Sequence, residues 1–126
     1  MLGLCGESDF RLVHDLIAKG DEDARIALDV YLHRLKKYIG GYTAVLGGLD
    51  VITFTAGIGE NDDAVRAGAL DGLEHLGIKL DPELNAGRVK EPKIVSTDDS
   101  PVTVVVYPTN EELAIARHTM RTAGLD

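Results

Sequence analysis

Apolar residues recur at every third or fourth position in four stretches of the chain, and this spacing predicts four amphipathic helices. They are expected from Ser8 to about Lys19, over residues 22–46, from Val65 to Gly77, and after Pro108. The side chain of Ser8 can cap the first helix. Gly40 and Gly41 lie inside the second helix and predict a kink or a close contact with another helix.

Short runs rich in β-branched residues predict three strands. Val51–Thr55 reads as a buried strand, because it is apolar and bounded by glycines. Ile94–Thr97 and Val102–Tyr107 flank Asp98–Pro101, whose residue types are typical of a turn, so we expect a hairpin. Residues 81–92 are expected to be mainly irregular.

The predicted order of elements is helix, helix, strand, helix, strand, strand, helix. This alternation is typical of an α/β fold in which helices flank a sheet. Three short strands make a thin sheet for so many helices, and no strand precedes the first helix. We therefore expect these residues to be one part of a larger sheet.

The composition fits an ordinary globular protein and excludes some partners. Hydrophobic residues make up 44% of the 126 residues and charged residues 27%, which argues against disorder. The net charge of −8 disfavours binding to nucleic acid or to an anionic membrane, because both need a basic surface. Cys5 is the only cysteine, no apolar stretch is long enough to span a bilayer, and the amino terminus does not resemble a signal peptide. We therefore expect a soluble, cytoplasmic protein.

The segment Gly57-Ile58-Gly59-Glu60-Asn61 lies between a predicted strand and a predicted helix, and it is a candidate phosphate-binding turn. Glycines allow the backbone to approach a ligand, and unpaired amides at a helix start can face it. An equally consistent alternative is a tight connection with Asn61 as the helix cap.

Two familiar nucleotide-binding motifs do not match this segment. Asp62 occupies the position of the third glycine of the dinucleotide pattern, and the lysine followed by serine or threonine of a P-loop is missing. Asp62 and Asp63 would repel a bare phosphate. This favours contact with a nucleoside or an α-phosphate over contact with a transferred γ-phosphate.

A second candidate site follows the last predicted strand, in Pro108–Glu112. If Thr109 caps the final helix, Glu112 falls at the third helical position and completes a capping box. Glu111 then has no capping role and could hold Mg²⁺ directly or through water. The alternative is that both glutamates only suit the positive end of the helix dipole.

The third candidate is Asp9-Phe10-Arg11, after Ser8. Phe10 could pack on a nucleoside, Asp9 could accept hydrogen bonds from its hydroxyls, and Arg11 could lie near its base or phosphate. The alternative is a surface cap with a solvated ion pair. The four histidines have no metal-ligand spacing, and we interpret them as structural or surface residues: His14, His33, His75 and His118.

Together, Asp9–Arg11, Gly57–Asn61 and Pro108–Glu112 resemble, in this order, the carboxy-terminal part of acetate kinases. The resemblance extends through Leu32–Gly48 and Gly72–Pro82, and so covers nearly the whole chain. It implies part of the ribonuclease-H-like fold shared with sugar kinases and actin, with a mixed sheet and flanking helices. It also implies reversible phosphoryl transfer between ATP and acetate with Mg²⁺, giving ADP and acetyl phosphate.

The resemblance assigns roles to individual residues. Asp9, Phe10 and Arg11 would help to form the nucleoside pocket, Gly57–Asn61 would be the nucleotide-binding turn, and Glu111 would be the magnesium ligand. Homodimers are usual in the family, and the tyrosine-rich helix at 22–46 is our candidate for part of the interface.

Family members are much longer than this chain, which leads us to expect residues 1–126 to be a carboxy-terminal nucleotide-binding portion whose amino-terminal half is absent. The absent half would hold the acetate pocket and the residues that meet the transferred phosphoryl group. A half-site should not catalyse phosphoryl transfer, which depends on positioning and charge stabilisation. Two alternatives stay open: a portion of a propionate or butyrate kinase, and a non-catalytic module for nucleotide binding or dimerisation.

Overall fold

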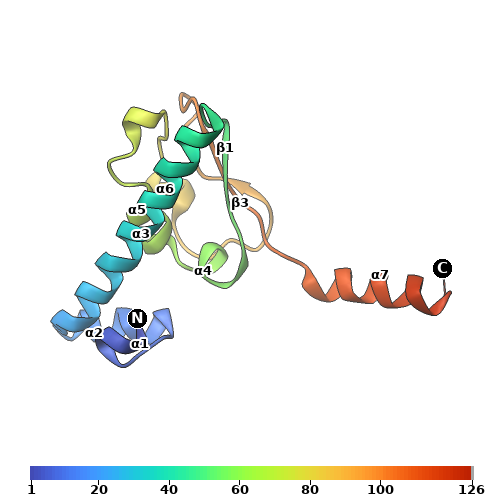
Figure 1. Ribbon diagram of the computed structural model, residues 1–126, viewed down its shortest axis with the longest axis horizontal. Coiled ribbons are helices and arrows are strands. Elements are labelled where there is room, and N and C mark those ends of the chain that lie inside the picture. The colour runs from blue at the N-terminus through green and yellow to red at the C-terminus, as the bar shows by residue number, and fades with distance from the viewer. Residues whose placement is uncertain (126) are drawn as a thin grey trace.

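The computed structural model describes residues 1–125 as a small sheet with helices packed against it and one helix that extends away (Figure 1). The helices are α1 (Leu2–Cys5), α2 (Phe10–Ala18), α3 (Glu22–Leu46), α4 (Ala56–Asn61), α5 (Asp63–Leu70), α6 (Pro82–Asn85) and α7 (Glu111–Ala123), with a 3-10 turn, η1, at Glu74–Leu76. The strands are β1 (Val51–Phe54), β2 (Lys93–Ile94) and β3 (Thr103–Val106).

The sheet is mixed, as the sequence predicts. Its strand order is β1-β3-β2, with β1 parallel to β3 and β2 antiparallel to it. Phe54 pairs with Val106, so β1 and β3 end at the same edge of the sheet. The predicted hairpin is confirmed, although β2 is only two residues long. The segments that follow β1 and β3 therefore leave the sheet side by side.

The hydrophobic core lies between β3 and the segments of residues 70–80 and 89–95. Its fully buried members include Ile78, Val95, Val104 and Val106. β1 contributes less than the sequence predicts, since Val51 and Thr53 are exposed and only Ile52 and Phe54 pack against the core. The prediction of a buried strand was wrong because β1 is an edge strand, and a short sequence does not reveal strand order.

Helix α3 matches its predicted span and is uninterrupted through Gly40 and Gly41. A Cβ atom at either glycine would meet no side chain and no other element within 4 Å, so the predicted close helix contact is not there. It occurs instead at Gly68 of α5, where a Cβ atom would lie 2.7 Å from a methyl group of Leu32. Gly68 lets α5 approach α3 closely.

Three other element boundaries differ from the prediction. Asp9, not Ser8, caps α2, and its carboxylate accepts a hydrogen bond of 2.9 Å from the Arg11 amide. The third predicted helix ends early at Leu70, because Asp71 and Gly72 turn the chain before η1. The stretch expected to be irregular contains the short helix α6, which Asp81 caps.

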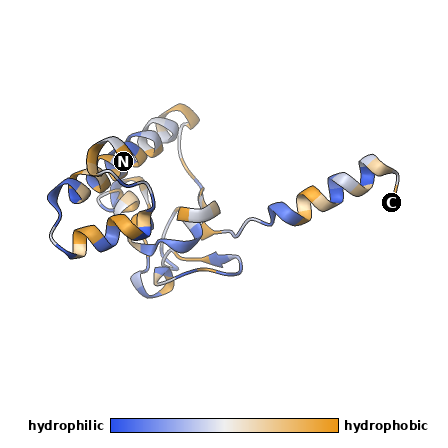
Figure 2. Cartoon of the chain, turned by 90° about the horizontal axis from the view of Figure 1, so that it is seen from below, coloured by the Kyte–Doolittle hydropathy of each residue, from blue (hydrophilic) through white to orange (hydrophobic). Residues whose placement is uncertain are grey.

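Helix α7 projects away from the rest of the molecule (Figure 1). None of its residues is buried, and Figure 2 shows apolar and polar turns alternating along it. Its cap is Asn110, which accepts from the Leu113 amide at 3.0 Å, so the predicted Thr109 cap is displaced by one residue. None of the helices within residues 1–125 is long and apolar enough to cross a membrane.

Candidate functional site

The segment Gly57–Asn61 is helical, where the sequence predicts a turn. It forms most of α4, which begins directly after β1. The unusual backbone angle belongs to Ala56, whose φ of 60° lies in the left-handed region, and not to Gly57 or Gly59. Such an angle costs an L-residue about 1–2 kcal/mol. The sharp entry from β1 into α4 therefore stores strain at the position where the candidate site begins.

The two glycines of α4 have different roles. A Cβ atom at Gly59 would lie 3.2 Å from the main-chain carbonyl carbon of Phe54, so Gly59 allows α4 to pack against the end of β1. A Cβ atom at Gly57 would meet no protein atom within 4 Å. Gly59 is therefore required by the fold, whereas the space beside Gly57 is open to a ligand.

Arg66 of α5 holds α4 in place, and our sequence reasoning missed it. Its side chain is completely buried and donates four hydrogen bonds. One of 2.9 Å goes to the carbonyl of Gly59, two go to the side-chain and main-chain oxygens of Asn85, and one goes to the carbonyl of Gly87. Arg66 has the helical spacing of the apolar residues Ala69, Leu70 and Leu73, and this spacing could have indicated that it lies on the buried face.

Burial lowers the pKa of the Arg66 guanidinium, because the charged form loses hydration. The nearby charges of Asp63 and Asp62 act in the opposite direction. Four oxygen acceptors with short bonds satisfy the buried charge without a direct ion pair. The backbone of α4 is thus tied to a charged side chain that uses four of its five N–H donors.

Two of the three candidate segments line one cavity of about 530 Å³. Its walls come from Asp9–Arg11 and from α4, and they also include Arg88, which our sequence reasoning did not single out. The complete lining is Ser8, Asp9, Phe10, Arg11, Gly57, Ile58, Asn61, Asp62 and Arg88. Gly59 and Glu60 do not line it. The volume falls in the range of about 300–1,000 Å³ that is typical of small-molecule sites.

The wall formed by Asp9–Arg11 is held by local contacts. Arg11 donates to the Asp9 carboxylate through Nε at 3.1 Å and Nη2 at 2.5 Å. Phe10 packs edge-on against Tyr31 of α3, with ring centroids 4.8 Å apart. The Arg11 side chain and its amide lower the pKa of Asp9 to about 2. The predicted ion pair is therefore present, whereas the cap is Asp9 in place of the predicted Ser8, and Asp9 and Arg11 both line the cavity.

The Asp9 carboxyl should titrate near pH 2 in a ¹³C NMR titration, against an ordinary value of 3.8. Because its pKa is lower in the folded state, the Asp9 contribution to stability is complete above about pH 4 and disappears as the pH falls through 2. Replacing Arg11 by alanine should move the midpoint back toward 3.8, since only the amide contact remains. An unchanged midpoint in that variant would exclude the Arg11 side chain as the main cause.

The two aspartates after α4 are both engaged by protein groups. Asp62 caps α5 by accepting from the Val65 amide at 2.9 Å, and its other oxygen lies 2.8 Å from Nε2 of His14. Asp63 accepts from the Gly87 amide at 2.7 Å. Only Asp62 lines the cavity, so the expected repulsion of a phosphate comes from one carboxylate, whose two oxygens are both engaged by protein groups. His14 has the structural role expected of it.

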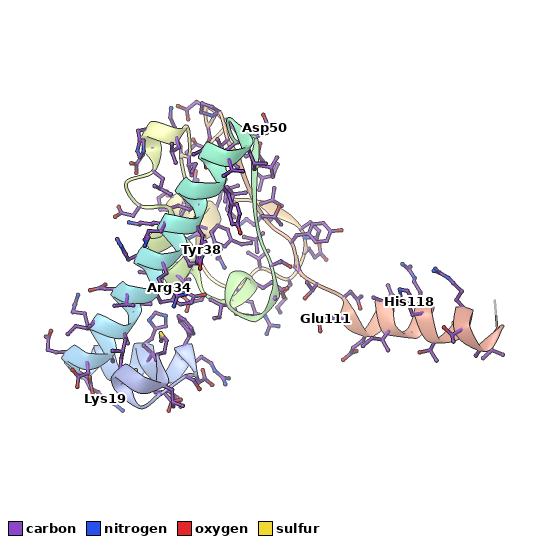
Figure 3. The ribbon with its side chains drawn as sticks, viewed as in Figure 1. Lys19, Arg34, Tyr38, Asp50, Glu111 and His118 are labelled. Atoms are coloured by element: carbon purple, nitrogen blue, oxygen red, sulfur yellow. The ribbon has the colours of Figure 1, made fainter. Side chains whose placement is uncertain are left out.

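Glu111 lies at the first position of α7, at the end of that helix nearest to the rest of the molecule (Figure 3). It lines a second cavity of about 370 Å³ together with Ala56, Gly57, Thr109, Asn110 and Glu112. Gly57 lines both cavities, which places Glu111 next to the first one. With Asn110 as the cap, Glu112 is the second helical residue, so the predicted capping box does not form.

Glu111 is the candidate metal ligand that the sequence indicates, and one other carboxylate, that of Glu112, lines the same cavity. No group of three or more His, Cys, Asp or Glu side chains within residues 1–125 is arranged to hold a metal ion. So small a set of carboxylates would suit Mg²⁺, which is usually held by one or two carboxylates together with water and substrate phosphates. It does not suit a metal that needs a complete protein cage.

Comparison with known proteins identifies the family. The model of the acetokinase family matches residues 1–117. An acetate kinase of Leifsonia xyli subsp. xyli is 60% identical over 121 residues, which are 96% of this chain and 30% of that protein.

Solved structures give the same result. The crystal structure of Porphyromonas gingivalis acetate kinase superposes with a TM-score of 0.87 at 42% identity, covering 95% of this chain and 30% of that one. A propionate kinase from Francisella tularensis gives a TM-score of 0.79 at 36% identity, covering 91% and 29%. The chain thus spans about a third or less of the length of these relatives. The family match over 117 residues, together with these likenesses, shows that the chain belongs to the acetokinase family.

Proposed function

We propose that these residues are the carboxy-terminal, nucleotide- and Mg²⁺-binding portion of an acetate kinase, which transfers a phosphoryl group reversibly between ATP and acetate. The observation that supports this most directly is the cavity shared by Asp9–Arg11 and α4, with Glu111 beside it. These are the three segments that carry the family resemblance, and they converge at one end of the sheet although they are far apart in the sequence.

The nucleoside end of ADP or ATP fits the wall formed by Asp9–Arg11. Phe10 provides an apolar surface, and Oδ2 of Asp9, which accepts one hydrogen bond from Arg11, can accept another from a ribose hydroxyl. The phosphates then extend past Gly57, where no side chain blocks the backbone. Arg11 pairs with Asp9, and Arg88 supplies a positive charge that offsets Asp62 in the same cavity.

Glu111 is the proposed ligand for Mg²⁺, which would neutralise phosphate charge when bound. Its place at the start of α7, next to the open space at Gly57, lets one carboxylate reach a metal carried by the phosphates. The second cavity has room for that metal and its water molecules. The acetate pocket is expected outside these 126 residues, so the chain alone should bind nucleotide without turning it over.

Thermal melting with and without MgADP tests this proposal. Saturation at 100 times the dissociation constant should stabilise the fold by about 2.7 kcal/mol. In Glu111→Gln the shift with MgADP should fall to the level seen with metal-free ADP, because the amide is a poor magnesium ligand. A coupled kinase assay on the same chain should show no turnover.

The outcomes separate the alternatives. No melting shift at any nucleotide concentration would exclude a nucleotide site formed by these residues. An unchanged shift in Glu111→Gln would favour a role for Glu111 in the helix start only. Turnover by the wild-type chain would contradict the assignment of the catalytic groups to another part of the enzyme.

Two other functions have specific support. The likeness to a propionate kinase keeps a longer acyl substrate as an alternative, to be decided by assaying the complete enzyme with both acids. A dimerisation role is favoured by α3, which exposes Tyr38, Tyr42, Val45 and Leu46, with the two tyrosine rings stacked 6.3 Å apart. Sedimentation as a monomer at all concentrations would count against that role.

A further inference from the structure

The carboxylate of Glu60 joins the segment after β1 to the segment after β3. Its Oε1 accepts a hydrogen bond of 2.8 Å from the Thr109 amide and one of 3.1 Å from the Thr109 hydroxyl. The two residues are 49 positions apart in the sequence. One oxygen atom thus receives both donors of Thr109, which fixes this residue in position and in orientation.

Glu60 lies outside the space that we propose for the nucleotide. It belongs to α4, but it lines neither the cavity beside Asp9–Arg11 nor the cavity beside Glu111. The Thr109 amide is the main cause that lowers the pKa of Glu60, in keeping with a carboxylate engaged by the protein. The sequence-based expectation that Glu60 contacts nucleotide therefore finds no support in the geometry.

The position of α7 depends on this contact. The Tyr107 amide donates a hydrogen bond of 2.8 Å to the Phe54 carbonyl. This is the last main-chain hydrogen bond between the segment after β3 and the segment after β1. Pro108 has no amide hydrogen, and the next tie along the chain is Thr109 to Glu60. Asn110 then caps α7, and none of the helix that follows is buried. The orientation of Glu111 is thus set by the residues just before it.

We propose that Glu60 is a positioning residue, which holds Thr109 so that Glu111 faces the phosphate end of the nucleotide. This inference rests on the proposed nucleotide and Mg²⁺ site. It assigns Glu60 an indirect role, through Glu111, in the affinity for the metal-bound nucleotide. It also explains how two segments from different strands act as one site.

The experiment compares the wild-type chain with Glu60→Ala, and with Glu91→Ala as a control for charge at an exposed position. Without nucleotide, Glu60→Ala should speed hydrogen exchange of the Thr109 amide by about threefold to tenfold, as expected for loss of a hydrogen bond to a carboxylate at the surface. Glu91→Ala should leave it unchanged. Glu60→Gln retains an acceptor oxygen and should show an intermediate rate.

Calorimetric titration of the same variants tests the role in binding. Glu60→Ala should weaken MgADP binding by about threefold to tenfold, the same fold-change expected for loss of its contact with Thr109, and leave the affinity for metal-free ADP unchanged. In the Glu111→Gln background, Glu60→Ala should have no further effect, because a residue that acts through Glu111 loses its influence when Glu111 is replaced.

Three results would overturn the proposal. Unchanged exchange of the Thr109 amide in Glu60→Ala would show that the contact does not hold this segment. If Glu60→Ala weakened ADP binding equally with and without Mg²⁺, Glu60 would be a nucleotide contact. The same would follow if Glu60→Ala caused the same loss of affinity in the Glu111→Gln background. If the wild-type chain bound no MgADP, the proposed function would fail, while the exchange rates would still decide whether Glu60 fixes Thr109.

Discussion

Replacing Arg66 by methionine is expected to lower the free energy of unfolding by about 3 kcal/mol, the largest stability effect we anticipate for a single substitution in this chain. Methionine fills most of the buried volume and donates no hydrogen bond. The carbonyls of Gly59, Asn85 and Gly87 and the side-chain oxygen of Asn85 would each lose a donor. Each unsatisfied buried acceptor costs about 1–3 kcal/mol. Relief from burying the charge offsets part of that sum.

Urea denaturation of the variant measures this loss, and two comparisons make it specific. Arg34→Met changes an exposed arginine and should stay within about 0.5 kcal/mol of the wild type. Arg66→Lys keeps the charge but has a single nitrogen, which cannot reach acceptors in several directions, so it should recover little stability. Wild-type stability in Arg66→Met would mean that water or rearranged main chain can replace the guanidinium.

Replacing Gly57 by valine is expected to abolish most nucleotide binding while leaving the fold intact. The Cβ atom of the new side chain would meet no other part of the protein within 4 Å, and the side chain would enter the open space that Gly57 shares with the two cavities. Overpacking of a fitted site costs about 1–3 kcal/mol, which corresponds to a loss of about 5- to 150-fold in affinity. Calorimetric titration with MgADP measures the loss, and a melting curve monitors the fold.

Gly59→Ala, two residues further along α4, is the matched control. Its new methyl group would press on the main chain of Phe54, which cannot move as a side-chain end can, so stability should fall by about 1–2 kcal/mol. The two substitutions should thus have different effects: the one at Gly57 should weaken nucleotide binding, and the one at Gly59 should lower stability. Nucleotide affinity close to wild type in Gly57→Val would place the ligand elsewhere.

The sequence predicted the elements that local pattern controls. The apolar spacing of α3 and the turn residues between β2 and β3 gave their type and position, because these signals lie within one segment. Both caps were predicted one residue too early, at Ser8 in place of Asp9 and at Thr109 in place of Asn110. All four of these residues carry side chains that can cap a helix. Only the path of the neighbouring chain decides between them.

The remaining features depend on contacts between distant residues. The role of Arg66 requires the carbonyls of Gly59 and Gly87 to meet it, and no local pattern shows that they do. The difference between Gly57 and Gly59 follows from the position of Phe54, and the engagement of Glu60 follows from the parallel pairing of β1 with β3. The sequence therefore indicated which segments form the candidate site, but not how they hold one another.

The exposure of α7 has a thermodynamic consequence for the proposed metal site. A helix of 13 residues with no buried side chain is marginally stable in water by itself, so we expect its residues to exchange between ordered and frayed states. Glu111 is its first residue, and a metal held there must select the ordered state. A partner whose surface covers α7 would select the same ordered state. Binding of that partner should therefore change the affinity for Mg²⁺, and Mg²⁺ should change the affinity for the partner by the same factor.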